Sequence, residues 1–419
     1  MKPSRIVILV IAGLVTATMP GAYAPHPTAK AAPLDRWLHG EVDRGAAGIA
    51  QVILTASADT SLAALAEGVR AVGGSIVNEL PVVNAVTARV PWKEVPALAR
   101  LSGVANISSD GAVTAAGASN TNVWTKRLPE THTYKALGIA DLSLMGDTIG
   151  VCVIDTGLVG GTMGTVSKFY TFLASPTTVK SVTAFDDNGH GTHVAGLIGD
   201  NGVQSYGNVG GVAPKVRFIG MKVLDANGQG RTSDVIRALD YAVQYRMTLG
   251  IDIINLSLGH PIYEPAATDP LVQAVERAVA AGIVVVASAG NRGMDDETGE
   301  VGYAGIVSPG NAPSAITVGA ADTLDTDSRS DDRVAPFSSR GPTWYDAYVK
   351  PDVIAPGRRE YSTATKGSKL YLDYPDKLVI FRNPTNNNVT GKEARYIKLS
   401  GSSMSTSVVS GVVARMMQA

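Results

Sequence analysis

The chain has 419 residues, of which 45% are hydrophobic and 17% are charged. This length allows one large domain and a smaller one, and the composition excludes an intrinsically disordered chain. The formal net charge of −1 gives no electrostatic reason to expect nucleic acid or an anionic membrane as a partner. A single cysteine, Cys152, excludes an internal disulfide, and its apolar neighbours predict an inert buried thiol.

The N-terminus has the three parts of a secretory signal peptide. Two basic residues, Lys2 and Arg5, precede an apolar run over residues 6–15, and a small-residue cleavage motif ends at Ala24. We therefore expect residues 1–24 to be removed and the protein to be secreted, either to the extracellular medium or to the periplasm. No later apolar segment reaches the roughly 20 residues that a transmembrane helix needs.

A small domain is expected next in the chain. Residues 25–47 are rich in Ala, Pro and Gly, which is typical of a linker. Residues 48–113 then follow the order βαββαβ, which predicts a ferredoxin-like α+β unit. Its expected elements are strands at 49–55, 75–80, 82–90 and 104–108, a helix over 61–72, and a helix within 92–101 that begins late or kinks because of Pro96.

Small and polar residues over 109–123 predict an exposed connector that proteases can cut, and hence a domain boundary. Beyond it, apolar β-branched runs alternate with helical stretches. This alternation is typical of a parallel sheet that helices cover on both faces. The runs lie at 149–154, 216–223, 251–258, 283–287 and 315–318, and the clearest helical stretches lie at 233–245 and 270–281.

Asp155 follows the first of these runs and begins the triplet Asp-Thr-Gly. The carboxyl end of a strand in an open α/β sheet is where functional groups gather, although a turn or helix cap would also use an aspartate here. The same triplet marks aspartic proteases. Those enzymes need two such carboxylates, and this chain has one such triplet, so a single-chain enzyme of that class is disfavoured.

Two glycines flank His190, which lets a substrate approach the ring closely, and His193 lies three residues further on. A metal site of the usual histidine type would place its two histidines four apart with a glutamate between them and would add a third ligand. The segment lacks that pattern. We therefore favour a catalytic histidine over a metal ligand.

Ser403 lies in a Gly-Ser-Ser-Met turn that leads into a helix of small and apolar residues. A serine at the start of a helix is commonly an N-cap. A nucleophilic serine in the same place gains an exposed hydroxyl and a backbone N–H aimed at a developing oxyanion.

Asp155, His190 and Ser403, in this chain order, resemble the catalytic triad of the subtilisin (subtilase) family of serine proteases. The resemblance covers residues 145–357 and 400–415. Further stretches that match the family are Leu256–Gly259, Val285–Asn291, Ser308–Pro313, Phe337–Pro342 and Pro351–Gly357.

The resemblance implies an α/β fold with a subtilisin-like three-layer parallel sheet over residues 114–419. It also implies that residues 48–113 are an inhibitory propeptide that is removed autocatalytically. Few residues follow Ser403, so the catalytic domain is expected to be incomplete at its C-terminus. An apolar stripe on the last helix, from Val408 to Met417, would then lose part of its cover.

The family's roles can be carried over to matching residues. Ser403 would be the nucleophile, His190 the general base and Asp155 the group that orients the imidazole. Asn291 would donate to the oxyanion together with the Ser403 N–H. His193 would be a structural residue of the helix.

Two further segments match the family's substrate-binding strands. Ser257, Leu258 and Gly259 would pair with an extended protein or peptide substrate, and Ser288, Ala289 and Gly290 would form a wall of the first specificity pocket. The small, uncharged residues predict broad cleavage with a preference for apolar side chains.

The chain also departs from the family. Ser407 replaces the proline that usually begins the helix after the nucleophile, and residues 358–399 form an insertion that we expect to be a surface hairpin near the cleft. Family members often bind calcium at the loop Asp200–Asn208, but residues 158–182 contain no acidic ligand, so we expect weak calcium dependence or none. The triad chemistry requires no cofactor.

These features predict a secreted, monomeric serine endopeptidase made as an autoprocessed zymogen, with its own propeptide as an intramolecular inhibitor. The alternative is a catalytically silent subtilase scaffold that acts as a binding module. Ser407 and the short segment after Ser403 favour this alternative.

Overall fold

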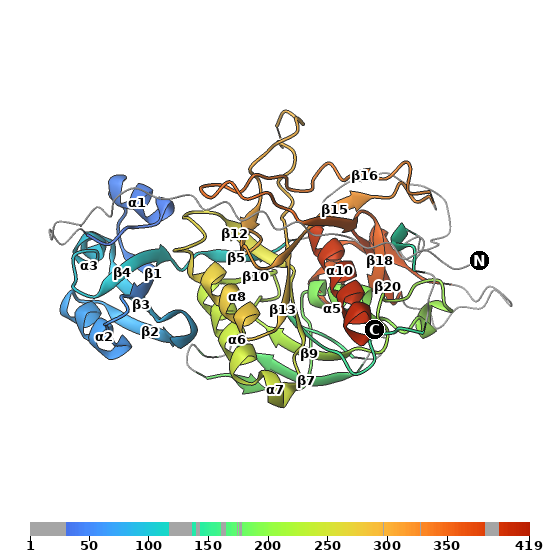
Figure 1. Ribbon diagram of the computed structural model, residues 1–419, viewed down its shortest axis with the longest axis horizontal. Helices are drawn as coiled ribbons and strands as arrows, with labels where there is room; N and C mark the ends of the chain where they lie inside the picture. The colour runs from blue at the N-terminus through green and yellow to red at the C-terminus, as the bar shows by residue number, and fades with distance from the viewer. Residues whose placement is uncertain are drawn as a thin grey trace, which may run out of the picture.

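The computed structural model describes residues 31–116, 136–139, 143–160, 165–173, 175, 178–295, 297–326, 328–381 and 394–419. The signal peptide expected over residues 1–24 and the second half of the expected connector lie outside these residues. A small N-terminal domain lies beside a larger domain (Figure 1). Within the described part of the chain, none of the helices is both long and apolar enough to span a bilayer.

The small domain has the predicted βαββαβ order, with its four strands in one antiparallel sheet of order β2-β3-β1-β4. Pro81–Val83 forms a 3-10 turn, so β3 begins at Ala85 and the strand predicted from residue 82 was too long. The second helix begins late, as Pro96 requires. The elements are β1 Ile49–Ala56, α2 Leu62–Ala71, β2 Ser75–Leu80, β3 Ala85–Pro91, a 3-10 turn Trp92–Glu94, α3 Val95–Leu98 and β4 Val104–Ser109.

The linker expected over residues 25–47 is wrong for its described part. Helix α1, Arg36–Asp43, begins at the cap Asp35, whose carboxylate accepts from Leu38 N, and the Leu38 side chain is fully buried in the small domain's core. Leu34 pairs with Ile107 beside β4. The Ala, Pro and Gly content masked this short amphipathic helix, which is part of the small domain.

The exposed connector expected from residue 109 is also wrong over 112–115. Ala112–Ala115 form strand β5, which lies between two strands of the larger domain in the sheet order β10-β5-β12-β14. Val113 is fully buried. The other strands of this sheet are β10 Gln229–Arg231, β12 Leu258–Pro261 and β14 Val307–Ser308.

The larger domain is built on the predicted parallel sheet. The strands β7, β9, β6, β11, β13, β15 and β17 run parallel, and β8 and β16 pair antiparallel at the edges. The strands are β6 Gly150–Asp155, β7 Val166–Thr171, β8 Lys180–Ser181, β9 Arg217–Lys222, β11 Ile253–Leu256, β13 Val284–Ser288, β15 Ile316–Asp322, β16 Arg333–Val334 and β17 Val353–Pro356.

Helices cover both faces of this sheet, as predicted (Figure 1). Alternate residues of β6 show the division, because Cys152 belongs to the core cluster shared with α6 and α8 whereas Val151 and Val153 belong to the cluster shared with α5 and α10. The Cys152 thiol is buried and free, as expected. The helices are α5 His190–Gly199, a 3-10 turn Val203–Ser205, α6 Thr232–Gln244, α7 Arg246–Leu249, α8 Pro270–Ala280 and α10 Ser402–Gln418.

The small domain packs against α6 and α8. Leu80 and Val83 of the small domain share a buried cluster with Leu271 of α8. The Asp110 carboxylate accepts from the Ser233 N–H in the first turn of α6 at 2.9 Å. A carboxylate of the small domain therefore caps a helix of the larger one.

The insertion at 358–399 folds into its own small sheet of order β18-β20-β19 and a short helix. The strands pair antiparallel, but the insertion is a three-stranded sheet with a helix and not the single hairpin that was predicted. On α10, Val408 is buried, whereas Met416 is 70% exposed. The elements of the insertion are β18 Glu360–Thr363, α9 Lys369–Asp373, a 3-10 turn Pro375–Lys377, β19 Leu378–Val379 and β20 Tyr396–Leu399.

Candidate active site

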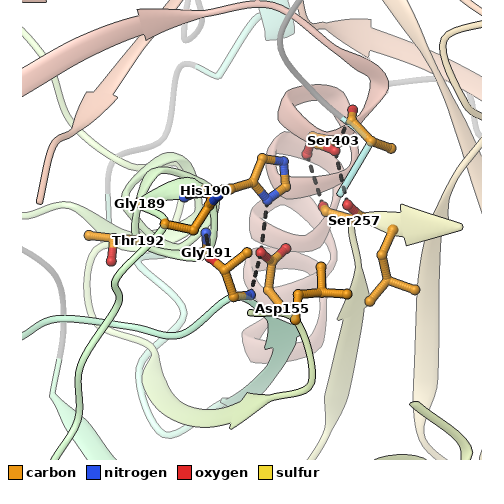
Figure 2. A network of polar contacts seen from close by, with 12 residues as sticks. Asp155, Gly189, His190, Gly191, Thr192, Ser257 and Ser403 are labelled. Atoms are coloured by element: carbon orange, nitrogen blue, oxygen red, sulfur yellow. Dashed lines mark hydrogen bonds and ion pairs between the residues drawn. The ribbon is translucent and has the colours of Figure 1, made fainter. Parts of the chain in front are cut away.

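Asp155 and His190 form a buried pair. Asp155 is the last residue of β6, His190 is the first residue of α5, and His190 Nδ1 lies 2.8 Å from Asp155 Oδ1. Both side chains are at most 1% exposed. Ser403 lies on the side of the ring away from Asp155 (Figure 2). The structure thus brings together the three residues that the sequence placed far apart in the chain.

The pair controls how the imidazole titrates. Burial lowers the pKa of His190, but the charge of Asp155, its hydrogen bond to the ring and the nearby charge of Asp186 outweigh burial and raise the pKa. His190 Nε2 is buried and finds no hydrogen-bond partner among the residues that the structure describes. This nitrogen is therefore free to exchange a proton with a group placed beside it.

Asp186 holds the loop that presents His190, and the sequence analysis missed it. One carboxylate oxygen accepts from Gly189 N at 2.8 Å and from the Thr156 hydroxyl at 2.9 Å, and the other accepts from Thr192 N at 2.9 Å. Gly189 has a φ of 102°, which a residue with a side chain rarely adopts. The sequence did contain a signal for Asp186, because aspartates that precede an Asn-Gly turn at the start of a helix commonly accept from the helix's first N–H groups.

Ser403 lies in the first turn of α10 and is fully buried. Its hydroxyl oxygen lies 2.6 Å from the carbonyl oxygen of Ala116 and 3.1 Å from that of Ser257. The one hydroxyl proton can be donated to one of these at a time. The Ser403 hydroxyl thus contacts the residue that directly follows strand β5.

Asn291 points at the same carbonyl group. Its side-chain Nδ2 donates to Ala116 O at 2.7 Å, while its Oδ1 accepts from Ser402 N at 2.8 Å. The second bond fixes which end of the amide faces Ala116, since only the nitrogen can donate. A peptide carbonyl therefore lies between a hydroxyl and an amide donor, and the Ser403 N–H as second oxyanion donor stays a prediction.

The segment around Ala116 lies in the cleft as an added strand. Ala116 N donates to Ser257 O at 3.0 Å, and β5 pairs with β12 through Ala115 opposite Leu258 and Thr114 opposite Gly259. The predicted pairing of Ser257–Gly259 with an extended chain thus occurs with the protein's own segment. On its other side β5 pairs with β10, a strand that the sequence analysis did not assign to the cleft.

The predicted pocket residues Ser288, Ala289 and Gly290 are buried at the end of β13. Ser288 Oγ donates to Leu258 O at 3.4 Å, and Ala289 O accepts from Val307 N at 3.1 Å. The three residues therefore lie next to β12 and β14. Their role as a wall of the first specificity pocket stays a prediction.

His193 takes no part in this group of residues. It is fully buried, and its Nε2 lies 3.3 Å and 3.2 Å from the carbonyl oxygens of Glu360 and Ile397 in the insertion. Burial and the neighbouring His190 lower the pKa of His193 to about 3, so its ring is neutral and donates to these carbonyls. This geometry agrees with the structural role that the family resemblance implied.

The structure shows the local contacts of Ser407 and of the loop that begins at Asp200. Ser407 Oγ donates to the Ser403 carbonyl at 2.8 Å, so the serine that replaces the usual proline bonds to the turn that carries Ser403. In the loop where family members often bind calcium, Asp200 is buried, and its carboxylate accepts from Gly202 N and the Thr363 hydroxyl. Across the described residues, no three His, Cys, Asp or Glu side chains form a group that could hold a metal ion.

Comparisons with known proteins agree with this arrangement. A profile described as "Subtilase family" matches residues 146–419, and one described as "Putative peptidase inhibitor domain" matches residues 40–110. The serine protease AprX of Bacillus subtilis (strain 168) is 38% identical over 283 residues, which cover 66% of this chain and 58% of AprX. This chain therefore spans about three fifths of the length of AprX.

Subtilisin E of the same strain is 32% identical over 298 residues, which cover 71% of this chain and 68% of subtilisin E. Among solved structures, fervidolysin from Fervidobacterium pennivorans, a keratinolytic enzyme related to subtilisin, has a TM-score of 0.64 at 23% identity. That match covers 93% of this chain and 56% of fervidolysin, and at this identity the likeness concerns the fold.

Proposed function

The chain belongs to the subtilase family, and from this premise we propose that it is a secreted serine endopeptidase made as a self-processing precursor. The observation that carries the proposal is the Ala116 carbonyl oxygen, which lies 2.6 Å from Ser403 Oγ and 2.7 Å from Asn291 Nδ2. A peptide group in this position has both a nucleophile and an oxyanion donor beside it.

In the proposed reaction, the Ser403 hydroxyl turns its proton from the neighbouring carbonyls to His190 Nε2, and its oxygen attacks the peptide carbon. Asn291 Nδ2 donates to the oxyanion that forms. His190 then gives the proton to the leaving amine, and the peptide C–N bond breaks. Water attacks the acyl-enzyme by the same route, with His190 again as base, and frees Ser403.

Asp155 supports this sequence through His190 Nδ1. Its hydrogen bond of 2.8 Å keeps the proton on Nδ1, which leaves Nε2 free to accept. The negative charge also stabilises the imidazolium that each transfer creates. Each step uses side chains of this protein alone, so the proposed reaction requires no cofactor.

We further propose that the propeptide includes helix α1 and ends at Ala116, which revises the expected bounds of 48–113. The β5 strand pairs with β10 and β12 as a substrate would, and the bond that follows Ala116 is the one presented to Ser403. After cleavage, β5 would remain in the cleft as a product-like inhibitor. The mature enzyme would act outside the cytoplasm as a monomer on protein and peptide substrates.

Labelling with a fluorophosphonate tests the proposal directly. The processed chain should react at Ser403 and hydrolyse casein, and Ser403→Ala should do neither while keeping its fold. An unlabelled parent chain that does not hydrolyse casein would instead support the catalytically silent scaffold.

A further inference from the structure

The short helix α9 of the insertion is fastened to the loop that presents the catalytic histidine. Lys369 N donates to Asp187 O at 2.9 Å and Leu370 N donates to Asn188 O at 2.9 Å, two residues before His190. Ser368 caps the helix through its side chain. These bonds place the inserted helix beside the catalytic centre.

A cavity of about 220 Å³ lies between α9 and the strand in the cleft. Thr114 and Ala115 of β5 line it, together with Asn188 and His190 at the start of α5 and with residues 227–229 at the start of β10. The remaining wall is made by α9 and the residue that follows it, through Lys369, Leu370, Asp373 and Tyr374. We refer to this cavity as the α9 pocket.

Leu370 and Tyr374 supply the apolar part of a lining that is otherwise largely polar. Leu370 and Tyr374 pack against the cluster of Leu197, Ile397, Leu399 and Met404, and Met404 directly follows the nucleophile. Lys369 Nζ and Asp373 Oδ2 pair with each other at 2.9 Å on the exposed side of the helix. The packing holds the wall in place, and the pair leaves no unbalanced charge on it.

Ala115 is the residue before Ala116, whose carbonyl faces Ser403. The methyl group of Ala115 leaves the α9 pocket unfilled. We propose that α9 determines which side chain a substrate presents at this position, and that the pocket takes a side chain larger than alanine whose apolar part contacts Leu370 and Tyr374. The inference rests on the proposed endopeptidase function. It makes Leu370 and Tyr374 specificity-determining residues supplied by the insertion.

The test compares two chromogenic peptides that copy residues 113–116, Val-Thr-Ala-Ala-p-nitroanilide and Val-Thr-Leu-Ala-p-nitroanilide. The enzyme is expressed as the full chain and allowed to process. We expect kcat/KM of the parent to be at least about tenfold higher for the leucine peptide, because each methylene buried against Leu370 and Tyr374 favours binding of the transition state.

Leu370→Trp fills the pocket and should lower kcat/KM for the leucine peptide by about tenfold, with less than about a twofold change for the alanine peptide. It should still process itself, because its own segment presents Ala115. Leu372→Ala is the matched control, since Leu372 lies on the same helix, is 66% exposed and does not line the pocket. This control should leave kcat/KM unchanged for both peptides.

If Leu370→Trp does not process, Leu370→Ala replaces it and should reduce the preference for leucine by about fivefold. Equal kcat/KM of the parent for both peptides, or an equal loss for both in the Leu370 variants, would overturn the role of α9 while leaving the endopeptidase intact. A parent that cleaves neither peptide and takes no fluorophosphonate would overturn the proposed function and this inference with it.

Discussion

His190 and His193 occupy the same helix but have opposite electrostatic environments. The carboxylate of Asp155 raises the pKa of His190 against the effect of burial, whereas burial without a carboxylate lowers the pKa of His193 to about 3. A group is suited to proton transfer when its pKa lies near the working pH. The partners of each ring, rather than its place in the motif, therefore distinguish the proposed base, His190, from His193.

The environment of His193 predicts an acid-sensitive fold. The unfolded chain protonates this histidine near pH 6.5, but the folded chain does not until about pH 3, so the stability it contributes above pH 6.5 is lost as the pH falls below that value. In the Ser403→Ala chain, which cannot digest itself, the melting temperature should fall between pH 6.5 and pH 4. His193→Gln should flatten this slope, and an unchanged slope would contradict the prediction.

Asn291 donates to the Ala116 carbonyl, and its worth in catalysis can be measured. Asn291→Ala should lower kcat by about 10²–10³, the range measured for the oxyanion donor of subtilisin, with little change in KM. The hydrogen bond from Asn291 is strongest when negative charge develops on the carbonyl oxygen in the transition state. Its loss should therefore lower kcat. A raised KM with an unchanged kcat would show that Asn291 only helps to bind the ground state.

Among the helices and strands, β5 is the element that holds the Ala116 carbonyl beside Ser403. Its burial removes the Val113 side chain from water, which stabilises the docked segment by about 1.5–3 kcal/mol, and its backbone pairs on both edges. Nothing local in Ala112–Ala115 predicts a strand with two partners more than 100 residues away. The sequence therefore predicted a cut site within residues 109–123 but not the strand that precedes it.

The interface between β4 and the loop before α8 predicts that propeptide docking weakens as the pH rises. Glu264 is 7% exposed and accepts from Asn106 of the small domain at 2.7 Å. Burial, and then the charges of Asp269 and Asp35, raise its pKa to about 8. Burial also raises the pKa of Asp35 and of Asp110 in the same interface.

The docked state thus holds protons that the released state gives up. As the pH rises from about 4.5 towards about 8, the released form of Glu264 ionises and the docked form does not, so docking loses free energy across this window. After cleavage, casein hydrolysis should appear faster at pH 8 than at pH 5. Glu264→Gln should reduce this pH dependence, and a release rate that is equally pH-dependent in the variant would contradict the prediction.

The loop from Asp200 to Asn208 is expected to fold without a strong calcium requirement. The Asp200 carboxylate is occupied by Gly202 N at 2.7 Å and by the Thr363 hydroxyl at 3.0 Å, and calcium prefers several oxygen ligands with carboxylates among them. A chelator should lower the melting temperature of the Ser403→Ala chain by less than about 3 °C. A larger drop would reveal a calcium site.

For the whole molecule, the sequence predicted the parts whose signals are local. Apolar runs and helical periodicity gave the parallel sheet with helices on both faces, and short motifs gave Asp155, His190 and Ser403. Helix α1 was missed because its composition suggested a linker, although Leu38 is buried. Asp186, β5 and α9 act through partners far along the chain, and such contacts leave little trace in local sequence.

The mass and N-terminal sequence of the first processed product test the proposed precursor most directly. The full chain should cleave itself once between Ala116 and Gly117, because the Ala116 carbonyl is the one placed between Ser403 and Asn291. Purified Ser403→Ala should remain intact through the same time course. A first product that begins elsewhere, or a Ser403→Ala chain that still processes itself, would contradict this assignment of nucleophile and scissile bond.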